Sequence, residues 1–383
     1  MSALAELPNG VTVLSRTAVT FLSVSLNSLF VTSTFLGITK DMFGYPFKLF
    51  GSINIMLSNK KLKETLDELS WIKKCYNKHY SIPKKKYDSD YDKKLRTVLK
   101  AVVQQINKDV EQASEQITLM KNGPGAPPKD RILLTKLHLM QVLFDFTNRE
   151  MECFSIMFLL KGDDYFSYKT IERAYEDPVV AMILHNMFVL SAGEPREIDA
   201  SGDGTGSALI ISKHYKTDRL RDLKNKKDTT KRKQYVFSVA IVDLDTNLYV
   251  GFASGFVSEK QLFKQALTML NTNGFTIKKM RLDKYYSHQS IFELFGNKTQ
   301  LYLIPKSNAT IRGNKKWKTM LKQFINNTMN FLAEYHKRSK SESNFSIDKR
   351  KHGLIRQKKP ERIINTTFTR AIIHNYRQKH LHN

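Results

Sequence analysis

Cysteine is almost absent from this sequence of 383 residues, which contains only Cys75 and Cys153. The two lie far apart and lack metal-ligand spacing, which argues against a disulfide framework and against a zinc ribbon. So few cysteines fit a reducing cytoplasm. Acidic residues are also scarce, because 36 Asp and Glu stand against 62 Lys and Arg and leave a net charge of +26. A chain this basic indicates a polyanionic partner, and nucleic acid is the commonest one.

Long apolar runs are missing too, and only residues 17–39 raise the question of a membrane segment. These 23 residues carry no charge and are long enough to cross a bilayer. Ten of them are Ser, Thr or Asn, whereas a spanning helix is richer in apolar residues. No basic region precedes the stretch, which argues against a signal peptide. We therefore predict a buried part of an N-terminal domain and no membrane partner.

Helical patterns dominate the first half of the chain. Apolar residues at helical spacing predict helices over residues 50–120, and a stretch rich in Gly and Pro at 121–130 interrupts them. The next residues predict a helix buried on most sides and then one or two short helices, interrupted near Pro178. We expect a mostly helical N-terminal region over residues 1–90, with a DNA-binding or accessory role, and a helical domain over residues 91–190.

From about residue 195 the pattern changes to strands and helices. A short strand that runs into a glycine-rich loop comes first, and a β-hairpin over residues 234–256 follows it. A helix, a strand, a short helix, a strand and a long helix come next. An antiparallel meander followed by α/β crossovers is the order of a ribonuclease-H-like fold. The prediction for residues 191–383 is therefore an α+β or α/β domain, with a mixed sheet flanked by helices.

Positive charge is concentrated in two stretches. Residues 306–383 contain 19 Lys and Arg against 4 acids, and residues 213–233 contain another 10 Lys and Arg. Within the first stretch, Glu342 has cations on both sides. On a helical wheel it shares an arc of about 60° with a tyrosine, an arginine and a lysine. An exposed Arg–Glu pair at i,i+4 spacing would explain this with a contribution of roughly 0.2–0.5 kcal/mol.

Three acids stand where a ribonuclease-H-like sheet would bring them together. Asp199 follows the first strand, Asp283 ends the strand after the first crossover helix, and Glu342 lies on the late helix. Clustered carboxylates repel one another unless cations hold them, and Mg²⁺ prefers oxygen ligands. Two ions about 4 Å apart would stabilise the attacking and leaving oxygens of a phosphoryl displacement. Taken singly, Asp199 and Asp283 are explained equally well as loop caps at strand ends.

The motifs around these acids resemble DDE transposases of prokaryotic insertion sequences. "IDASG" resembles the first-Asp motif of that family, and "RLDKYYSHQSIFEL" resembles the stretch with the second Asp. The Tyr-x2-Arg-x3-Glu-x6-Lys signature of the family is matched by Tyr335, Arg338, Glu342 and Lys349, with every gap correct. The resemblance covers about residues 120–380 in order.

The resemblance implies a transposase that cuts DNA at transposon ends and transfers the freed 3′-OH to target DNA. Asp199, Asp283 and Glu342 would be the catalytic acids and would bind two Mg²⁺ ions, with Mn²⁺ as a substitute. The Tyr, Arg and Lys of the signature would contact double-stranded DNA near the cleaved phosphate. A homodimer on DNA is expected, in a prokaryotic cytoplasm and associated with the nucleoid.

Alternatives remain open at two levels. Asp203, in "DGTG", is a second candidate for the first acid, although Asp199 directly follows the apolar strand residue Ile198. A non-catalytic DNA-binding protein derived from a transposase is the alternative function, and the intact spacing of the acids favours the enzyme. A membrane-associated basic protein would depend on residues 17–39 alone.

Other residues carry weaker signals. Trp317 could stack on a base, but such a residue more often packs in a core. His214, His288 and His336 lie near the motifs without metal-ligand spacing, and solvated or phosphate-contacting roles are expected for them. Asp243 lies at the predicted hairpin turn, where Asp is common.

Overall fold

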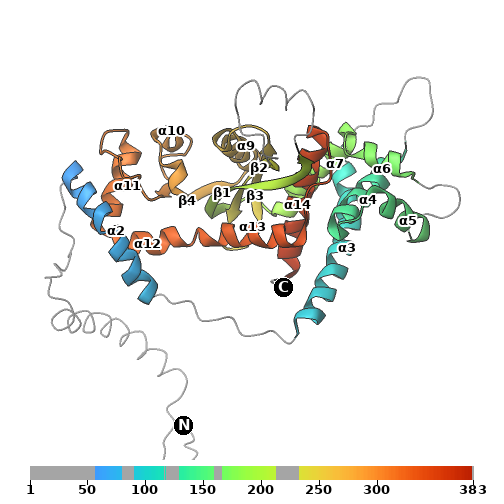
Figure 1. Ribbon diagram of the computed structural model, residues 1–383, viewed down its shortest axis with the longest axis horizontal. Helices are drawn as coiled ribbons and strands as arrows, with labels where there is room; N and C mark the ends of the chain where they lie inside the picture. The colour runs from blue at the N-terminus through green and yellow to red at the C-terminus, as the bar shows by residue number, and fades with distance from the viewer. Residues whose placement is uncertain are drawn as a thin grey trace, which may run out of the picture. The chain divides into compact units, whose positions relative to one another are not determined.

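The structure is a computed structural model that describes residues 57–79, 90–115, 117, 129–158, 166–212 and 233–381 (Figure 1). The charge-free stretch 17–39 lies outside the described residues, and so do most of the break at 121–130 and residues 213–232 of the second basic run. Among the helices that are described, none is both long enough and apolar enough to span a bilayer.

In the described part of the chain, six helices precede the sheet. They are α2 (Asn59–His79), α3 (Tyr91–Glu115), α4 (Arg131–Phe144), α5 (Asn148–Phe158), α6 (Tyr168–Ala174) and α7 (Pro178–Ala192). Asp130 and Asp177 accept hydrogen bonds from the first-turn N–H groups of α4 and α7, and Pro178 occupies the first turn of α7. Nine of the 14 residues of α4 are buried. The predicted buried helix and the interruption near Pro178 are both confirmed.

A five-stranded mixed sheet follows these helices. Its strands are β1 (Glu197–Ser212), β2 (Lys233–Asp243), β3 (Tyr249–Gly255), β4 (Thr276–Leu282) and β5 (Gln300–Tyr302). They lie in the order β3-β2-β1-β4-β5. The first three strands pair antiparallel, and β4 pairs parallel with both β1 and β5. The predicted hairpin, the later crossovers and a mixed sheet are thus confirmed.

Helices cover both faces of the sheet (Figure 1). The helix α9 (Glu259–Thr272) packs on one face, and α12 (Thr328–His336), α13 (Ser339–Lys351) and α14 (Pro360–Leu381) pack on the other. The segments η1 (Lys284–Tyr286), α10 (Gln289–Phe292) and α11 (Lys315–Asn326) complete the described elements.

The single long helix predicted after the last strand is divided into α11 and α12. Asn327 leaves the helical conformation, with φ −145° and ψ 63°, and its side chain accepts a hydrogen bond from the N–H of Asn330. Asparagine competes with helical backbone hydrogen bonds in this way and therefore favours helix caps.

The glycine-rich stretch after Asp199 is part of a strand, so the prediction of a loop here is wrong. Residues 200–208 of β1 pair with β2 without interruption. At Gly202, a Cβ atom would lie 2.6 Å from Met280 Cε and 2.8 Å from Phe263 Cε2. The missing side chain therefore lets α9, which carries Phe263, approach the sheet closely.

Two large groups of buried side chains form the core. One includes α9, α11 and α12 with the sheet, and Leu62 and Leu69 of α2 belong to it. The other joins α3, α4 and α7 to β2, β3 and α14, through residues such as Val102, Leu139 and Tyr249. Packing is therefore continuous across residue 190, and the division into a 91–190 and a 191–383 domain stays a prediction.

Candidate functional site: acids around Arg338

The register of β1 against β4 decides which acids are neighbours. Gly202 pairs with Leu282, so the next residues of the two strands, Asp203 and Asp283, lie at the same level. Asp199 pairs with Lys279, four residues before Asp283. At about 3.3 Å per residue, Asp199 lies about 13 Å back along the strands. Strand pairing therefore brings Asp203, and not Asp199, next to Asp283.

Three carboxylates converge on Arg338. Its Nη1 atom lies 3.2 Å from Asp203 Oδ2. Its Nη2 atom lies 2.7 Å from Glu342 Oε1 and 3.6 Å from Asp283 Oδ1. The arginine comes from the joint between α12 and α13, and the acids come from β1, the end of β4 and α13. One side chain thus joins acids that are far apart in the sequence.

The chain between α12 and α13 stays nearly helical, so part of the residue arrangement predicted from the helical wheel is retained. Lys337 and Arg338 retain helical backbone angles, and the N–H groups of Arg338 and Ser341 donate to carbonyls three residues earlier. Such a turn is tighter than an α-helix but continues in the same sense. Tyr335 is therefore still beside Arg338, whose Cζ lies 5.6 Å from the ring centroid. Burial raises the pKa of the Tyr335 phenol, and the arginine opposes this.

Lys349 lies apart from this cluster. It is exposed on α13, seven residues beyond Glu342, and forms no ion pair with the three acids of the described cluster. Seven residues of helix correspond to about 10 Å. Of the four signature residues, the structure brings Tyr335, Arg338 and Glu342 together and leaves Lys349 two turns away.

Asp199 belongs to a different ion-pair network. Its Oδ2 atom lies 3.2 Å from Arg281 Nη2 and 3.9 Å from Lys279 Nζ. Arg281 is fully buried and is also paired with Glu334 of α12, to whose carbonyl its Nε donates. The network joins β1, β4 and α12. Arg281 begins the motif "RLDKYYSHQSIFEL", but neither it nor Glu334 carried a signal of its own in the sequence.

The environment of Asp203 suits a bound cation. Its pKa is raised to about 6, mainly by burial, with Arg338 opposing and the carboxylates of Glu342 and Asp283 adding to the rise. Additional positive charge would stabilise the ionised form. In the described residues no group of three His, Cys, Asp or Glu is close enough to hold a metal ion, and the Arg338 guanidinium fills the position between the acids. Carboxylate oxygens are the donor type that Mg²⁺ prefers.

The weaker candidates have structural roles. Trp317 is buried and packs edge-on against Phe292 at 5.2 Å between centroids, so the packing interpretation is confirmed. His288 caps α10 through a bond to Ser290, and His336 stacks on Tyr76. Asp243 is buried and paired with Arg196. His214 lies outside the described residues.

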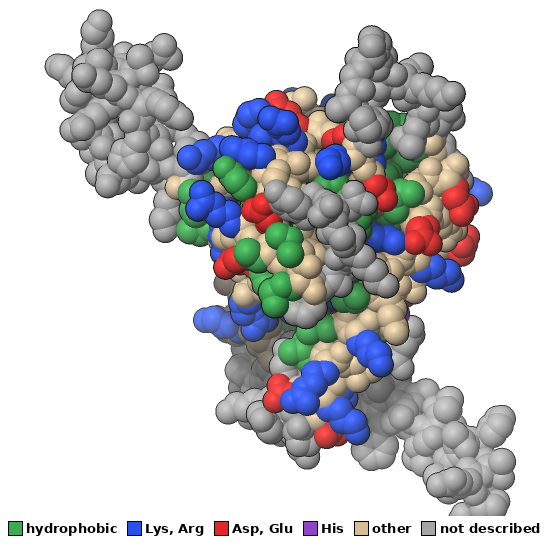
Figure 2. Space-filling model, turned by 90° about the vertical axis from the view of Figure 1, so that its right-hand side faces the viewer, with side chains coloured by type: hydrophobic (Ala, Val, Ile, Leu, Met, Phe, Trp, Pro, Cys, Tyr) green, Lys and Arg blue, Asp and Glu red, His purple; other side chains and the backbone are tan. Residues whose placement is uncertain are grey.

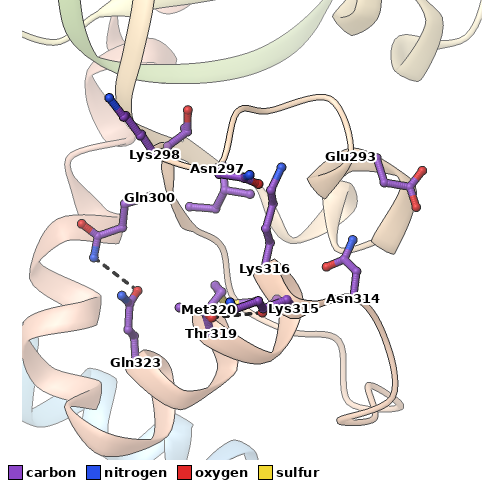
Figure 3. Close-up of a pocket in the computed structure, with 12 residues that line it drawn as sticks. Glu293, Asn297, Lys298, Gln300, Asn314, Lys315, Lys316, Thr319, Met320 and Gln323 are labelled. Carbon is purple, nitrogen blue, oxygen red and sulfur yellow. Dashed lines mark hydrogen bonds between the residues drawn. The ribbon is translucent and has the colours of Figure 1, made fainter.

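A hollow of about 660 Å³ lies at the edge of the sheet, between the amino end of β5 and the start of α11 (Figure 3). Gln300 and Gln323 are hydrogen-bonded on one side of it, at 3.2 Å. Because β5 runs parallel to β4, this end of the strands is opposite to Asp283. Its charged lining consists of Glu293, Lys298, Lys315 and Lys316. The hollow is basic and lacks the three acids, so we do not assign the phosphoryl chemistry to it.

The chain belongs to the family of insertion-sequence transposases, because a protein of that family is 36% identical to it over 331 residues. This relative is the probable transposase for insertion sequence element ISA1214 of Archaeoglobus fulgidus. The alignment covers 85% of the present chain and 97% of the relative. No family model matches the sequence.

Proposed function

We propose that the protein is a DNA transposase that cuts strands at transposon ends in a Mg²⁺-dependent reaction and transfers the 3′-OH to target DNA. The observation that carries this proposal is the convergence of Asp203, Asp283 and Glu342 on one cationic position. Membership of the transposase family supports the same reaction class. We further propose a homodimer on DNA as the active form.

The strand order supports a ribonuclease-H-like catalytic domain. An antiparallel β3-β2-β1 meander is extended by β4 and β5, which run parallel to β1. The order along the chain, an antiparallel meander followed by α/β crossovers, is the one expected for that fold from the sequence. In this sheet Asp203, within β1, lies level with Asp283 at the end of β4, and a late helix can supply a third acid.

We assign the first acid of the site to Asp203 in place of Asp199. Asp203 lies level with Asp283 and within 3.2 Å of the arginine that also holds Glu342. Asp199 is engaged by buried Arg281 on another part of the strand. Asp199 also lies about 13 Å back along the strands from the level of Asp283, too far for the two carboxylates to share an ion.

Each residue of the site has a proposed role in metal or DNA binding. Asp203, Asp283 and Glu342 would hold the divalent ions, which supply Lewis-acid stabilisation to the reacting phosphate. Arg338 would leave the acids and contact a DNA phosphate, for which its planar fork of donors is suited. Tyr335, buried beneath it, limits the positions that the guanidinium can take. Lys349 would contact the DNA backbone further along α13.

The charge of the chain supports DNA as the partner. A net charge of +26 destabilises a compact protein by self-repulsion unless a polyanion binds. On the face drawn in Figure 2, Lys and Arg side chains are spread among acidic and hydrophobic ones. DNA contact is therefore not explained by one basic stripe on this face. The non-catalytic alternative would bind DNA equally well, so only a cleavage experiment separates the two.

The full-length protein is expected to nick a plasmid that carries the gene with its flanking DNA. Nicking should require Mg²⁺ or Mn²⁺ and should stop in EDTA, because carboxylates alone cannot stabilise the charge that develops on the phosphate. Strand nicks are mapped by primer extension. Binding of the same DNA without any metal-dependent nicking would favour the non-catalytic alternative.

A further inference from the structure

A second hollow begins beside the acid cluster. It encloses about 390 Å³ between β1 and the helices α13 and α14. Thr205 lines it, two residues beyond Asp203 and therefore on the same face of β1. Lys349 lines it from α13, seven residues beyond Glu342. These spacings correspond to about 7–10 Å along the strand and the helix.

Positive charge gathers around this hollow. Lys349 and Arg370 line it, and His352 between them is buried and uncharged near neutral pH. The pKa of His352 is lowered to about 3 by burial and by the nearby cations Arg370 and Arg377. Burial and Arg377 likewise lower the pKa of Lys351. The shifts show that positive charge from Arg370 and Arg377 reaches this part of the fold, while Lys349 and Arg370 are the cations that line the hollow itself.

The acid that lines the hollow is already engaged. Asp348 accepts a hydrogen bond from Tyr249 Oη at 2.7 Å, and its other oxygen lies 2.9 Å from His374 Nδ1. His374 in turn stacks on the Tyr249 ring, with 3.9 Å between the centroids. With both oxygens engaged in this cluster, Asp348 forms no ion pair with Lys349 or Arg370 among the described residues, although its charge partly offsets the effect of burial on the pKa of Arg370.

Arg370 lines the hollow without a direct ion pair: burial lowers its pKa, and the more distant carboxylates of Asp145 and Asp348 oppose this only in part. Its Nη2 donates to the carbonyl of Gly353 at 3.2 Å, and its buried Nε has no hydrogen-bond partner. No ion pair joins it to a carboxylate within the described part of the chain. Arg370 has an intermediate exposure, so its guanidinium is only partly removed from water. Partial burial of a cation without an ion pair still costs free energy, and a bound anion would recover part of that cost.

Arg362, two turns earlier on α14, shows the opposite arrangement. Its guanidinium pairs with both Glu172 and Glu176, the latter at 2.8 Å. The same helix thus carries one arginine that is satisfied within the fold and one that is not. Arg362 is a matched control for any experiment on Arg370.

We propose that the hollow between β1, α13 and α14 binds a backbone phosphate of the DNA strand that lies at the acid cluster, with Arg370 and Lys349 as its cationic ligands. This inference rests on the proposed function for the identity of the anion. It adds Arg370, which lies outside the Tyr-Arg-Glu-Lys signature, to the residues that position the DNA. Phosphate bound here would fix the strand a few nucleotides from the reacting bond.

Thermal unfolding of the full chain in inorganic phosphate tests the site without any cleavage. Phosphate, compared with sodium chloride at equal ionic strength, should raise the Tm of the wild type, because a ligand of the native state stabilises it. Arg370→Gln should abolish this rise. Without phosphate, the variant should unfold at the same temperature as the wild type or higher, since an uncompensated cation has been removed.

Arg362→Gln should behave in the opposite way, with a lower Tm and an unchanged response to phosphate. Lys349→Gln, a change at an exposed position, should reduce the response without lowering the Tm. The inference is overturned if Arg370→Gln lowers the Tm as Arg362→Gln does and still responds fully to phosphate. That result would make Arg370 a structural residue.

Binding to duplex DNA of unrelated sequence, measured by fluorescence anisotropy without divalent metal, links the anion site to DNA. Arg370→Gln should reduce the slope of log K against log salt by about one unit. An unchanged slope would contradict the assignment to a DNA phosphate. These measurements do not involve nicking, so the absence of metal-dependent nicking would refute the proposed function and leave the anion site standing.

Discussion

Asp203→Asn is expected to reduce Mg²⁺-dependent nicking by roughly 100-fold or more, because the lost ligand removes several kcal/mol of charge stabilisation. Asparagine keeps the size and hydrogen bonding of the side chain but not its charge. Asp203 shares Arg338 with Asp283 and Glu342. Glu342→Gln should therefore produce a loss of similar size, while DNA binding stays unchanged or becomes slightly tighter.

Asp199→Asn is the matched control for this experiment. It lies on the same strand and is also partly exposed, at 26% against 14% for Asp203, but its partners are Arg281 and Lys279. Nicking should stay within about threefold of the wild-type rate, since the three acids around Arg338 remain in place. If Asp199→Asn abolished nicking and Asp203→Asn did not, the first acid would be Asp199 after all.

Arg281→Met is expected to destabilise the fold by about 3 kcal/mol. The arginine is fully buried and holds both Asp199 and Glu334. Its removal leaves two carboxylates without their main partner at the contact between β4 and α12. The side chains of Asp199 and Glu334 are 26% and 23% exposed. Because water reaches both carboxylates, the expected loss of stability is at the lower end of the roughly 3–5 kcal/mol typical of broken buried ion pairs. Urea unfolding followed by circular dichroism measures the change.

Arg350→Met is the control for the stability experiment. Arg350 is exposed on α13, and its guanidinium donates to the Ser346 carbonyl within the same helix. The expected change is below about 0.5 kcal/mol. Equal effects of the two substitutions would mean that the network around Arg281 does not hold the helix to the sheet.

The order of the elements could be predicted from the sequence because each one carries a local signal. Asp177 and Pro178 mark the start of α7, and Ser258 caps α9 where a helix was expected to begin. The alternation of β-branched and aromatic residues identified the hairpin of β2 and β3. Such signals depend on neighbours in sequence and are not changed by the rest of the fold.

The choice between Asp199 and Asp203 could not be made from the sequence, because it depends on strand register. The glycines after Asp199 predict a loop by their own propensity. In the folded protein they form a strand, since Gly202 leaves room for Phe263 and Met280. Only when β1 is known to continue past these glycines does Asp203 come level with Asp283.

The cationic hollow could not be found from the sequence for a related reason. Arg362 and Arg370 occupy the same helix, in similar basic and polar surroundings. Their different roles follow from α6 and the turn after it, which bring Glu172 and Glu176 to Arg362, while no carboxylate of the described chain pairs with Arg370. Charge pairing between distant segments is a property of the tertiary structure.

Binding of Mn²⁺ to the full chain, measured by electron paramagnetic resonance in the presence of duplex DNA, tests the three-acid site most directly. The account predicts that Asp203→Asn, Asp283→Asn and Glu342→Gln each weaken Mn²⁺ binding by roughly tenfold or more, as expected for the loss of a ligand. Asp199→Asn should bind Mn²⁺ as the wild type does. Wild-type Mn²⁺ affinity in Asp203→Asn, or its loss in Asp199→Asn, would contradict the site described above.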